Sequence, residues 1–82
     1  MSFDFRIDSL EFDVVDGVCL AYMVYQYDSI YDRERFLELC ADEIETIFGF
    51  DYTVFDDEDS VEIVFTLENR EDFEYLRNYL EV

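Results

Sequence analysis

The sequence contains no histidine, no lysine, no tryptophan and no proline, and only two glycines and two cysteines among its 82 residues. Without His or Lys, and without a Gly-rich loop, the chain lacks the usual general bases, Schiff-base amines and phosphate cradles of enzymes. Paired carboxylates can hydrolyse glycosides, but that mechanism needs a cleft, and a domain of this size has little room for one. The sequence therefore predicts a protein that is not an enzyme and that uses no cofactor.

Cations are also scarce, because five Arg stand against 23 Asp and Glu, which gives a formal net charge of −18. Proteins bind nucleic acids and anionic membranes through Lys and Arg that neutralise phosphates, so neither is expected as a direct partner. The sequence has no apolar run long enough to span a bilayer and no basic start typical of a signal peptide. We expect a cytoplasmic protein whose partners are basic.

Metal and disulfide sites are weakly supported. Asp56, Glu58 and Ser60 alternate as ligands do in a calcium loop, but Val61 and Leu67 occupy the positions where an EF-hand has Gly and Glu. No metal site is predicted. Cys19 and Cys40 fall on apolar segments, where buried free thiols are the preferred interpretation and a disulfide is the alternative.

The apolar content indicates a folded chain. Hydrophobic residues make up 51% of the sequence and aromatic residues 20%, far more than an acidic disordered tail contains. Because the chain is short and has no linker-like stretch, residues 1–82 are expected to form a single domain.

The N-terminal half predicts a β-hairpin centred on Asp16-Gly17, a pair that favours the positive φ angles of a type I′ turn. Upstream, the apolar phase changes near Ser9, from odd positions (Phe3, Phe5, Ile7) to even positions (Leu10, Phe12, Val14). Either a β-bulge corrects the phase within one long first strand, or a turn divides it. The bulge is the preferred interpretation.

Two helices and a second hairpin are predicted downstream. A first helix is expected from about 33 to 48, with Asp32 as N-cap, Gly49 as the left-handed residue after its end, and a buried face of Leu37, Cys40, Ala41, Ile44, Ile47 and Phe48. Residues 50–55 and 61–67 read as strands, with Val61, Ile63, Phe65 and Leu67 on one side and D-D-E-D-S at the tip. Asn69 is expected to cap the last helix, with Phe73, Leu76 and Leu80 inward.

The helix starts D-R-E-R-F-L-E-L and N-R-E-D-F-E-Y-L resemble each other, and each follows a strand–turn–strand unit. The chain therefore reads as two ββα units, ββαββα. We expect an α+β fold with a four-stranded, mainly antiparallel sheet, two helices on one face, and a long, bulged first strand.

The acidic residues form patterns that a partner could read. On the first helix, carboxylates at steps of three or four residues would lie along one exposed stripe. Steps of four rise about 6 Å, close to the roughly 7 Å between successive phosphates on one strand of a duplex. The predicted partner-binding residues are Glu34, Glu38, Asp42 and Glu45 on this stripe, Asp56, Asp57, Glu58 and Asp59 at the hairpin tip, and Glu71 and Glu74, with Glu81, on the last helix.

An acidic stripe is often only the solvated face of a helix, but here every element carries the excess and mixed-charge solubilisation does not explain it. One explanation is a halophile domain, whose acidity is adapted to saturated salt. The other is a DNA mimic, in which carboxylates replace phosphates. The high Phe, Tyr and Ile content favours the mimic.

The small size, the acidity of all elements, the segments E-R-F-L-E-L-C-A-D-E-I-E and D-D-E-D, and the abundant Tyr resemble phage-encoded DNA-mimic inhibitors of the anti-CRISPR and anti-restriction type. This resemblance implies a phage protein that blocks the nucleic-acid-binding site of a host defence protein. The alternative among binding proteins is an immunity-type inhibitor of a basic nuclease toxin.

The strand over residues 18–27 is apolar on both sides, with Val18, Leu20, Tyr22 and Val24 alternating with Cys19, Ala21, Met23, Tyr25 and Tyr27. One side must lie under the helices. The other side is either covered by loops or the N-terminal strand, or forms a Tyr-rich sheet face for a partner or for a homodimer.

Overall fold

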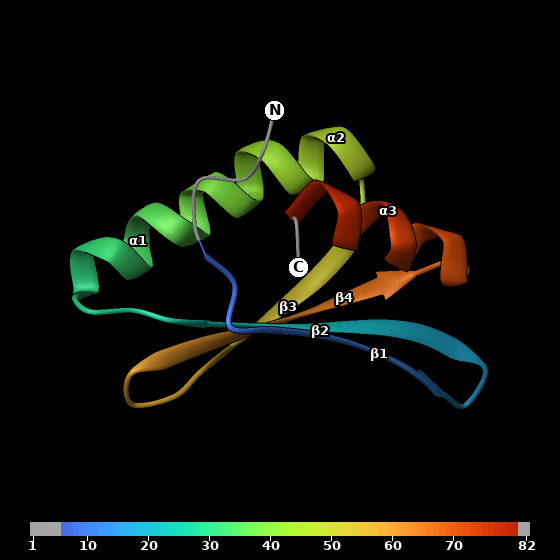
Figure 1. The fold of residues 1–82 in the computed structure, drawn as a ribbon, viewed down its shortest axis with the longest axis horizontal. Helices are drawn as coiled ribbons and strands as arrows, with labels where there is room; N and C mark the ends of the chain where they lie inside the picture. Colours follow the sequence, from blue (N-terminus) through green and yellow to red (C-terminus); the bar gives the residue numbers. More distant parts are fainter. Residues whose placement is uncertain (1–5, 81–82) are drawn as a thin grey trace.

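The computed structural model describes residues 6–80, apart from the side chain of Ile47. A four-stranded antiparallel sheet of order β1-β2-β4-β3 carries all the helices on one face (Figure 1). This arrangement confirms the α+β class and the ββαββα order. The elements are β1 (Ser9–Val15), β2 (Val18–Gln26), α1 (Ile30–Leu39), a π-helical segment η1 (Cys40–Glu45), α2 (Thr46–Phe48), β3 (Asp51–Asp56), β4 (Ser60–Leu67) and α3 (Arg70–Leu80).

The first hairpin forms as its turn residues require. Asp16 and Gly17 have φ angles of 53° and 79°, the two positive values of a type I′ turn, and Val15 pairs with Val18 across it.

The first strand is shorter than predicted. The prediction of one long strand is wrong over residues 6–8, because the chain bends at Asp8 and β1 begins at Ser9. The bend is fixed by Asp8, whose amide donates to the Val24 carbonyl and whose Oδ2 accepts from the Gln26 amide. Phe3 and Phe5 lie outside the described residues.

The first helix begins earlier than predicted. Ser29 is its N-cap, because it has extended backbone angles and its hydroxyl accepts from the amide of Asp32. Asp32 is therefore in the first turn, where its carboxylate interacts favourably with the helix dipole. The observed cap is of the predicted type, a short side-chain oxygen that accepts from a backbone amide of the first turn, but Ser29 supplies it in place of Asp32, three residues earlier.

The predicted buried face of this helix is corrected by η1. Phe36, Cys40 and Ile44 are fully buried at a spacing of four, whereas Leu37, Ala41 and Phe48 are only partly buried. A π-helix has more residues per turn than an α-helix, so a constant spacing of four keeps these three side chains against the sheet. The helix ends at Gly49, whose φ of 69° confirms the left-handed residue. Ile47 has no described side chain.

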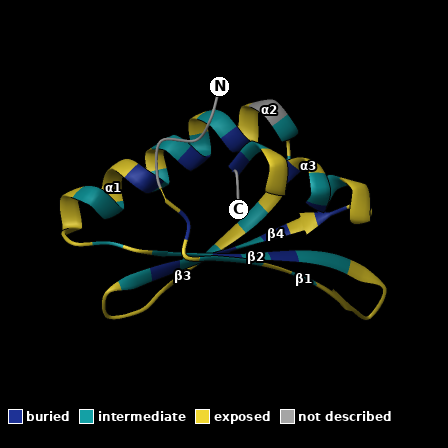
Figure 2. Cartoon of the chain, in the orientation of Figure 1, coloured by how far each residue is buried: buried dark blue, intermediate teal, exposed yellow. Residues whose placement is uncertain are grey.

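The core lies between the helices and the sheet, as the dark blue segments in Figure 2 show. Every second residue of β4 faces it, and burial of each such side chain contributes about 1.5–3 kcal/mol. Aromatic contacts complete the layer, among them Tyr25 stacked on Phe36 with ring centroids 4.2 Å apart. The core residues predicted on β4 and α3 are confirmed as buried: Val61, Ile63, Phe65, Leu67, Phe73, Leu76 and Leu80.

The last helix starts at a reciprocal cap. Asn69 Oδ1 accepts from the Asp72 amide at 3.1 Å, which confirms the predicted cap, and Asp72 Oδ2 accepts from the Glu68 amide at 3.0 Å. Within residues 6–80, no helix is both long enough and apolar enough to cross a membrane.

Candidate partner-binding surfaces

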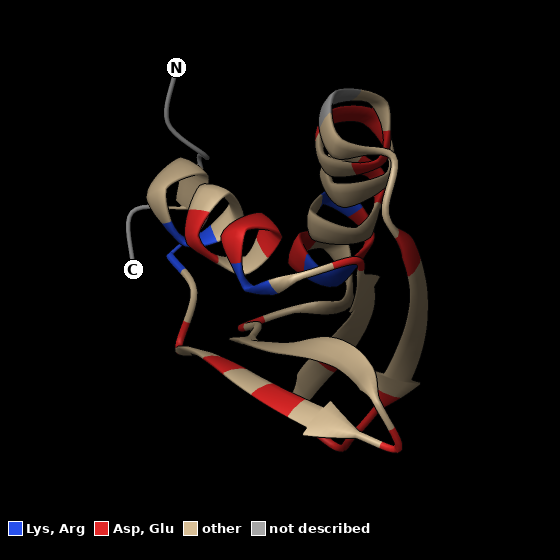
Figure 3. Cartoon of the chain, turned by 90° about the vertical axis from the view of Figure 1, so that its right-hand side faces the viewer, with Lys and Arg blue, Asp and Glu red and all other residues tan. Residues whose placement is uncertain are grey.

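The two signs of charge are separated between the layers of the fold. Among the described residues, no charged side chain is buried, and none of the four strands contains an Arg. Figure 3 shows the blue segments on the helices and on the segment before β1, while the strands are red and tan only. The sheet is therefore a purely acidic layer below a layer of mixed charge. The five Arg are Arg6, Arg33, Arg35, Arg70 and Arg77.

Three of the four carboxylates predicted on the first helix form one exposed row, called here the helix row: Glu34, Glu38 and Asp42. Glu45 is exposed but turns away from it, because η1 changes the angle between successive residues. The pKa of Tyr52 on β3 is raised by burial and by the nearby Glu45 carboxylate. Glu45 therefore faces β3.

The two flanks of this helix are tied to neighbouring elements. On one flank, Arg33 forms an ion pair with Asp56, the last residue of β3, with Nε 2.8 Å from Oδ1. On the other, the Tyr79 hydroxyl of α3 donates to Glu43 at 2.6 Å. Arg33 and Glu43 are therefore engaged within the molecule, whereas the helix row is exposed to solvent together with Ile30, Tyr31 and Arg35 of the same helix.

The D-D-E-D sequence is divided by the structure. Asp57, Glu58 and Asp59 form the acidic tip of the β3–β4 hairpin, where the Asp57 amide donates to the Ser60 carbonyl at 3.0 Å. Asp56 belongs to β3, and its charge is partly neutralised by Arg33. Of the four residues predicted to contact a partner, the three at the tip are exposed and form no ion pair with an Arg of the described chain.

The end of β2 holds the acidic tip in place. The Tyr27 amide donates to the Asp59 carbonyl at 3.1 Å, and the Gln26 side chain donates to Asp59 Oδ2 at 3.2 Å. The Tyr27 hydroxyl also lies 3.4 Å from the Asp57 carbonyl. Sequence reasoning did not assign these two residues a role, since the β2–β4 pairing that brings them to the tip joins segments more than 30 residues apart.

The predicted residues on the last helix are placed differently from each other. Glu71 is exposed in the first turn of α3, whereas Glu74 is partly buried and pairs with Arg77 at 2.7 Å. Glu81 lies outside the described residues. Glu71 is thus exposed and available to a partner, while the Glu74 carboxylate is paired with Arg77.

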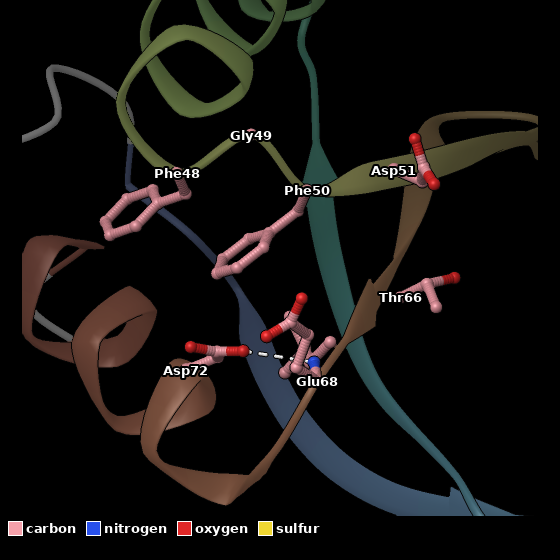
Figure 4. Close-up of a pocket in the computed structure, with 8 residues that line it drawn as sticks. Phe48, Gly49, Phe50, Asp51, Thr66, Glu68 and Asp72 are labelled. Carbon is pink, nitrogen blue, oxygen red and sulfur yellow. Dashed lines mark hydrogen bonds between the residues drawn. The ribbon is translucent and has the colours of Figure 1, made fainter.

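A pocket of about 310 Å³ opens between α2, the start of β3 and the start of α3 (Figure 4). Phe48 and Phe50 stack at its wall with centroids 5.2 Å apart, and Asp72 on the opposite side holds the Glu68 amide. Asp72 is thus engaged as a helix cap. Within residues 6–80 no group of three or more His, Cys, Asp or Glu is arranged to hold a metal ion.

The two cysteines are free thiols in the structure, with Cys19 partly exposed and Cys40 buried. Burial, together with the Glu43 carboxylate, raises the pKa of the Cys40 thiol to about 12. A thiol with so high a pKa is neutral at physiological pH and is a poor nucleophile. Cys40 therefore acts as a core residue.

The face of the sheet opposite the helices is uncovered by any described segment (Figures 1 and 2). The alternative that the N-terminal strand shields it is wrong, because β1 pairs in the plane of the sheet beside β2. We call this surface the open sheet face; Val15, Val18 and Phe55 on it are 43%, 43% and 53% exposed. Its other members are Ser9, Glu11, Asp13, Leu20, Tyr22, Val24, Gln26, Asp51, Thr53, Ser60, Glu62, Val64 and Thr66.

Comparison of the chain with protein-family models, with curated proteins and with solved structures finds no match in any of the three. The functional conclusion is therefore drawn from the helix row, the acidic tip and the open sheet face.

Proposed function

We propose that this protein is a non-enzymatic inhibitor that mimics DNA with its surface carboxylates and occupies the nucleic-acid-binding site of a host defence protein. The observation that carries the proposal is the helix row, in which Glu34, Glu38 and Asp42 lie exposed along the solvent side of one helix. Carboxylates at such intervals offer a basic groove the same charge-assisted hydrogen bonds that phosphates offer.

The overall charge supports the same function. With a net charge of −18, the protein attracts a cationic groove over several ångströms, and this attraction raises the association rate. The same field repels nucleic acid, so the protein competes with DNA and does not bind it. The acidic tip adds three further exposed carboxylates, and Tyr27 and Gln26 hydrogen-bond to it.

The target class follows from this chemistry. A groove that accepts the helix row must carry Lys or Arg at phosphate-like intervals, as CRISPR effectors and restriction enzymes do along their nucleic-acid channels. The resemblance to phage anti-CRISPR and anti-restriction inhibitors is one of size and acidity, and it agrees with such a target. We place the protein in the cytoplasm, which is the host cytoplasm if a phage encodes it.

The test is whether the partner can hold this protein and DNA together. A panel of purified CRISPR effectors, restriction enzymes and nuclease toxins is loaded with fluorescent duplex DNA or its guide–target duplex, and the protein is titrated in. The proposal expects displacement of the duplex from at least one member, with an affinity that falls steeply as salt increases. A partner that binds both at once in a ternary complex would contradict the proposal. Displacement limited to a nuclease toxin would instead favour the immunity-type inhibitor.

A further inference from the structure

We propose that the open sheet face binds a basic amphipathic helix of a partner protein, with the apolar side of that helix on the centre of the sheet and its Lys or Arg on the acidic edges. This site is separate from the helix row, on the opposite side of the molecule, and does not depend on the DNA-mimic function. DNA offers no apolar surface of this kind, so the site adds a protein-specific contact.

Strand pairing arranges the open sheet face in rows across the sheet. In one row Asp13 pairs with Leu20, Leu20 with Thr66, and Thr66 with Asp51. In the next, Glu11 pairs with Tyr22, and Tyr22 with Val64. Apolar side chains are therefore concentrated in the middle of the face, where Leu20, Tyr22 and Val24 on β2 lie beside Val64 on β4. Carboxylates flank them on the two edge strands, at Glu11 and Asp13 on β1 and at Asp51 on β3, and Glu62 adds one on β4.

The dimensions of the face fit one helix. Three spacings of about 4.8 Å separate β1 from β3, so the acidic edges lie about 14 Å apart. An α-helix with its side chains is about 10–12 Å wide, so one helix fills the apolar strip and brings its flanking cations to both edges.

A pocket of about 230 Å³ lies at one end of this strip, next to the hairpin tip. Val24 and Phe55 supply its apolar wall, and Asp57 and Glu62 contribute carboxylates. Lys and Arg combine a long methylene stem with a charged head. Such a side chain would place its stem against Val24 and Phe55 and its head between the carboxylates.

The charge of the open sheet face argues against its binding a second copy of this chain. A symmetric dimer would place the same face against itself, and the four strands contain acids but no cation to oppose them. Like charges brought together in a closing interface weaken association. A cationic partner therefore fits this surface better than a second acidic chain does. We do not propose the homodimer that the sequence analysis allowed for this face.

The experiment uses two synthetic 18-residue peptides of identical Leu and Lys composition, one with Leu on a single helical face and one scrambled. Each is titrated into isotopically labelled protein, and chemical shifts are followed by NMR. We expect the amphipathic peptide to produce saturable shifts at Leu20, Tyr22, Val24 and Val64, with an affinity about tenfold higher than that of the scrambled peptide. Shifts confined to the helix row, or equal affinity of the two peptides, would overturn the proposal.

Variants and sedimentation complete the test. Val64→Thr keeps a strand-forming residue of similar shape and should lower the affinity for the amphipathic peptide about tenfold or less, with no change for the scrambled one. The matched control, Glu38→Gln with Asp42→Asn on the helix row, should leave the response at Tyr22 and Val24 intact. Sedimentation of the protein alone should give a monomer, whereas a dimer that Val64→Thr dissociates would show that the face serves a second copy.

Discussion

Cys40 and Glu45 stand at the two ends of the π-helical segment, and their environments differ sharply. Cys40 is fully buried beside Phe36 and Ile44, whereas Glu45 is exposed and turned toward β3. The extra width of the π turn sets both positions, since it keeps Cys40 and Ile44 in line and removes Glu45 from the helix row. A single local change in helix geometry thus decides which residues belong to the core and which carboxylates face a partner.

Because the Cys40 thiol is buried, we expect the free energy of unfolding to fall at alkaline pH. The pKa of Cys40 is about 12 in the folded protein and 9.0 when the thiol is unperturbed. Above pH 9 the unfolded chain therefore loses this proton while the folded chain keeps it, so the free energy of unfolding falls as pH rises from 9 toward 12. Denaturant unfolding of the wild type between pH 8 and pH 11 should show a steeper fall than Cys40→Ala.

Cys19→Ala is the matched control, because Cys19 is partly exposed, and it should keep the wild-type slope. An equal slope in the wild type and Cys40→Ala would show that the buried thiol does not contribute to the alkaline loss.

The β3–β4 hairpin combines two roles that its sequence does not separate. Three residues of D-D-E-D form the acidic tip, and the fourth, Asp56, is an internal partner of Arg33. Repulsion among the tip carboxylates opposes folding, whereas the ion pair of Asp56 with Arg33 favours it modestly, because solvent screens a pair at the surface.

Neutralising these residues should therefore change stability in two directions. The tip variant Asp57→Asn, Glu58→Gln, Asp59→Asn is expected to retain the fold and to raise the melting temperature slightly, because like charges are removed from a solvated turn. Asp56→Asn is expected to lower the melting temperature slightly, because it removes the ion pair with Arg33. Thermal unfolding followed by circular dichroism measures both. Unfolding of the tip variant would mean that its carboxylates are structural.

The sequence was a good guide to elements whose signals are local. Asp16-Gly17 marks its turn, Gly49 ends its helix, Asn69 caps α3, and alternation along residues 61–67 gives the buried side of β4. The errors came from effects that are not local. The π-helical segment has no propensity signature in C-A-D-E-I-E, and the bend at Asp8 depends on hydrogen bonds to β2. Exposure of most candidate carboxylates could be predicted, and the Glu74–Arg77 pair at a spacing of three on one helix is a local contact. The Asp56–Arg33 ion pair joins residues 23 positions apart and required the fold.

The molecule as a whole carries its charge unevenly, with a cation-free sheet and an Arg-containing helical layer. A net charge of −18 on 82 residues raises the free energy of the compact state through self-repulsion. Salt screens such repulsion, because the Debye length falls from about 30 Å at 0.01 M to about 10 Å at 0.1 M. Stability should therefore depend on ionic strength more than on any single ion pair.

Added NaCl should raise the melting temperature while leaving the protein folded at physiological ionic strength. A gain of about 1 kcal/mol corresponds to roughly 4–8 °C for a domain of this size, so scanning calorimetry from 0.01 to about 0.5 M NaCl resolves it. A chain that stays unfolded until molar salt would identify the acidity as a halophile adaptation and contradict mimicry.

The measurement that tests the central claim most directly is the affinity of a DNA-displaced partner for two matched double variants. Glu38→Gln with Asp42→Asn removes two charges from the helix row, and Asp16→Asn with Glu68→Gln removes two exposed charges elsewhere. If the row replaces phosphates, the first variant should bind about tenfold or more weakly, the second within about threefold of wild type, and Glu45→Gln nearly as wild type. Equal affinities of the two double variants, measured by calorimetry at one salt concentration, would contradict the claim that the helix row imitates DNA.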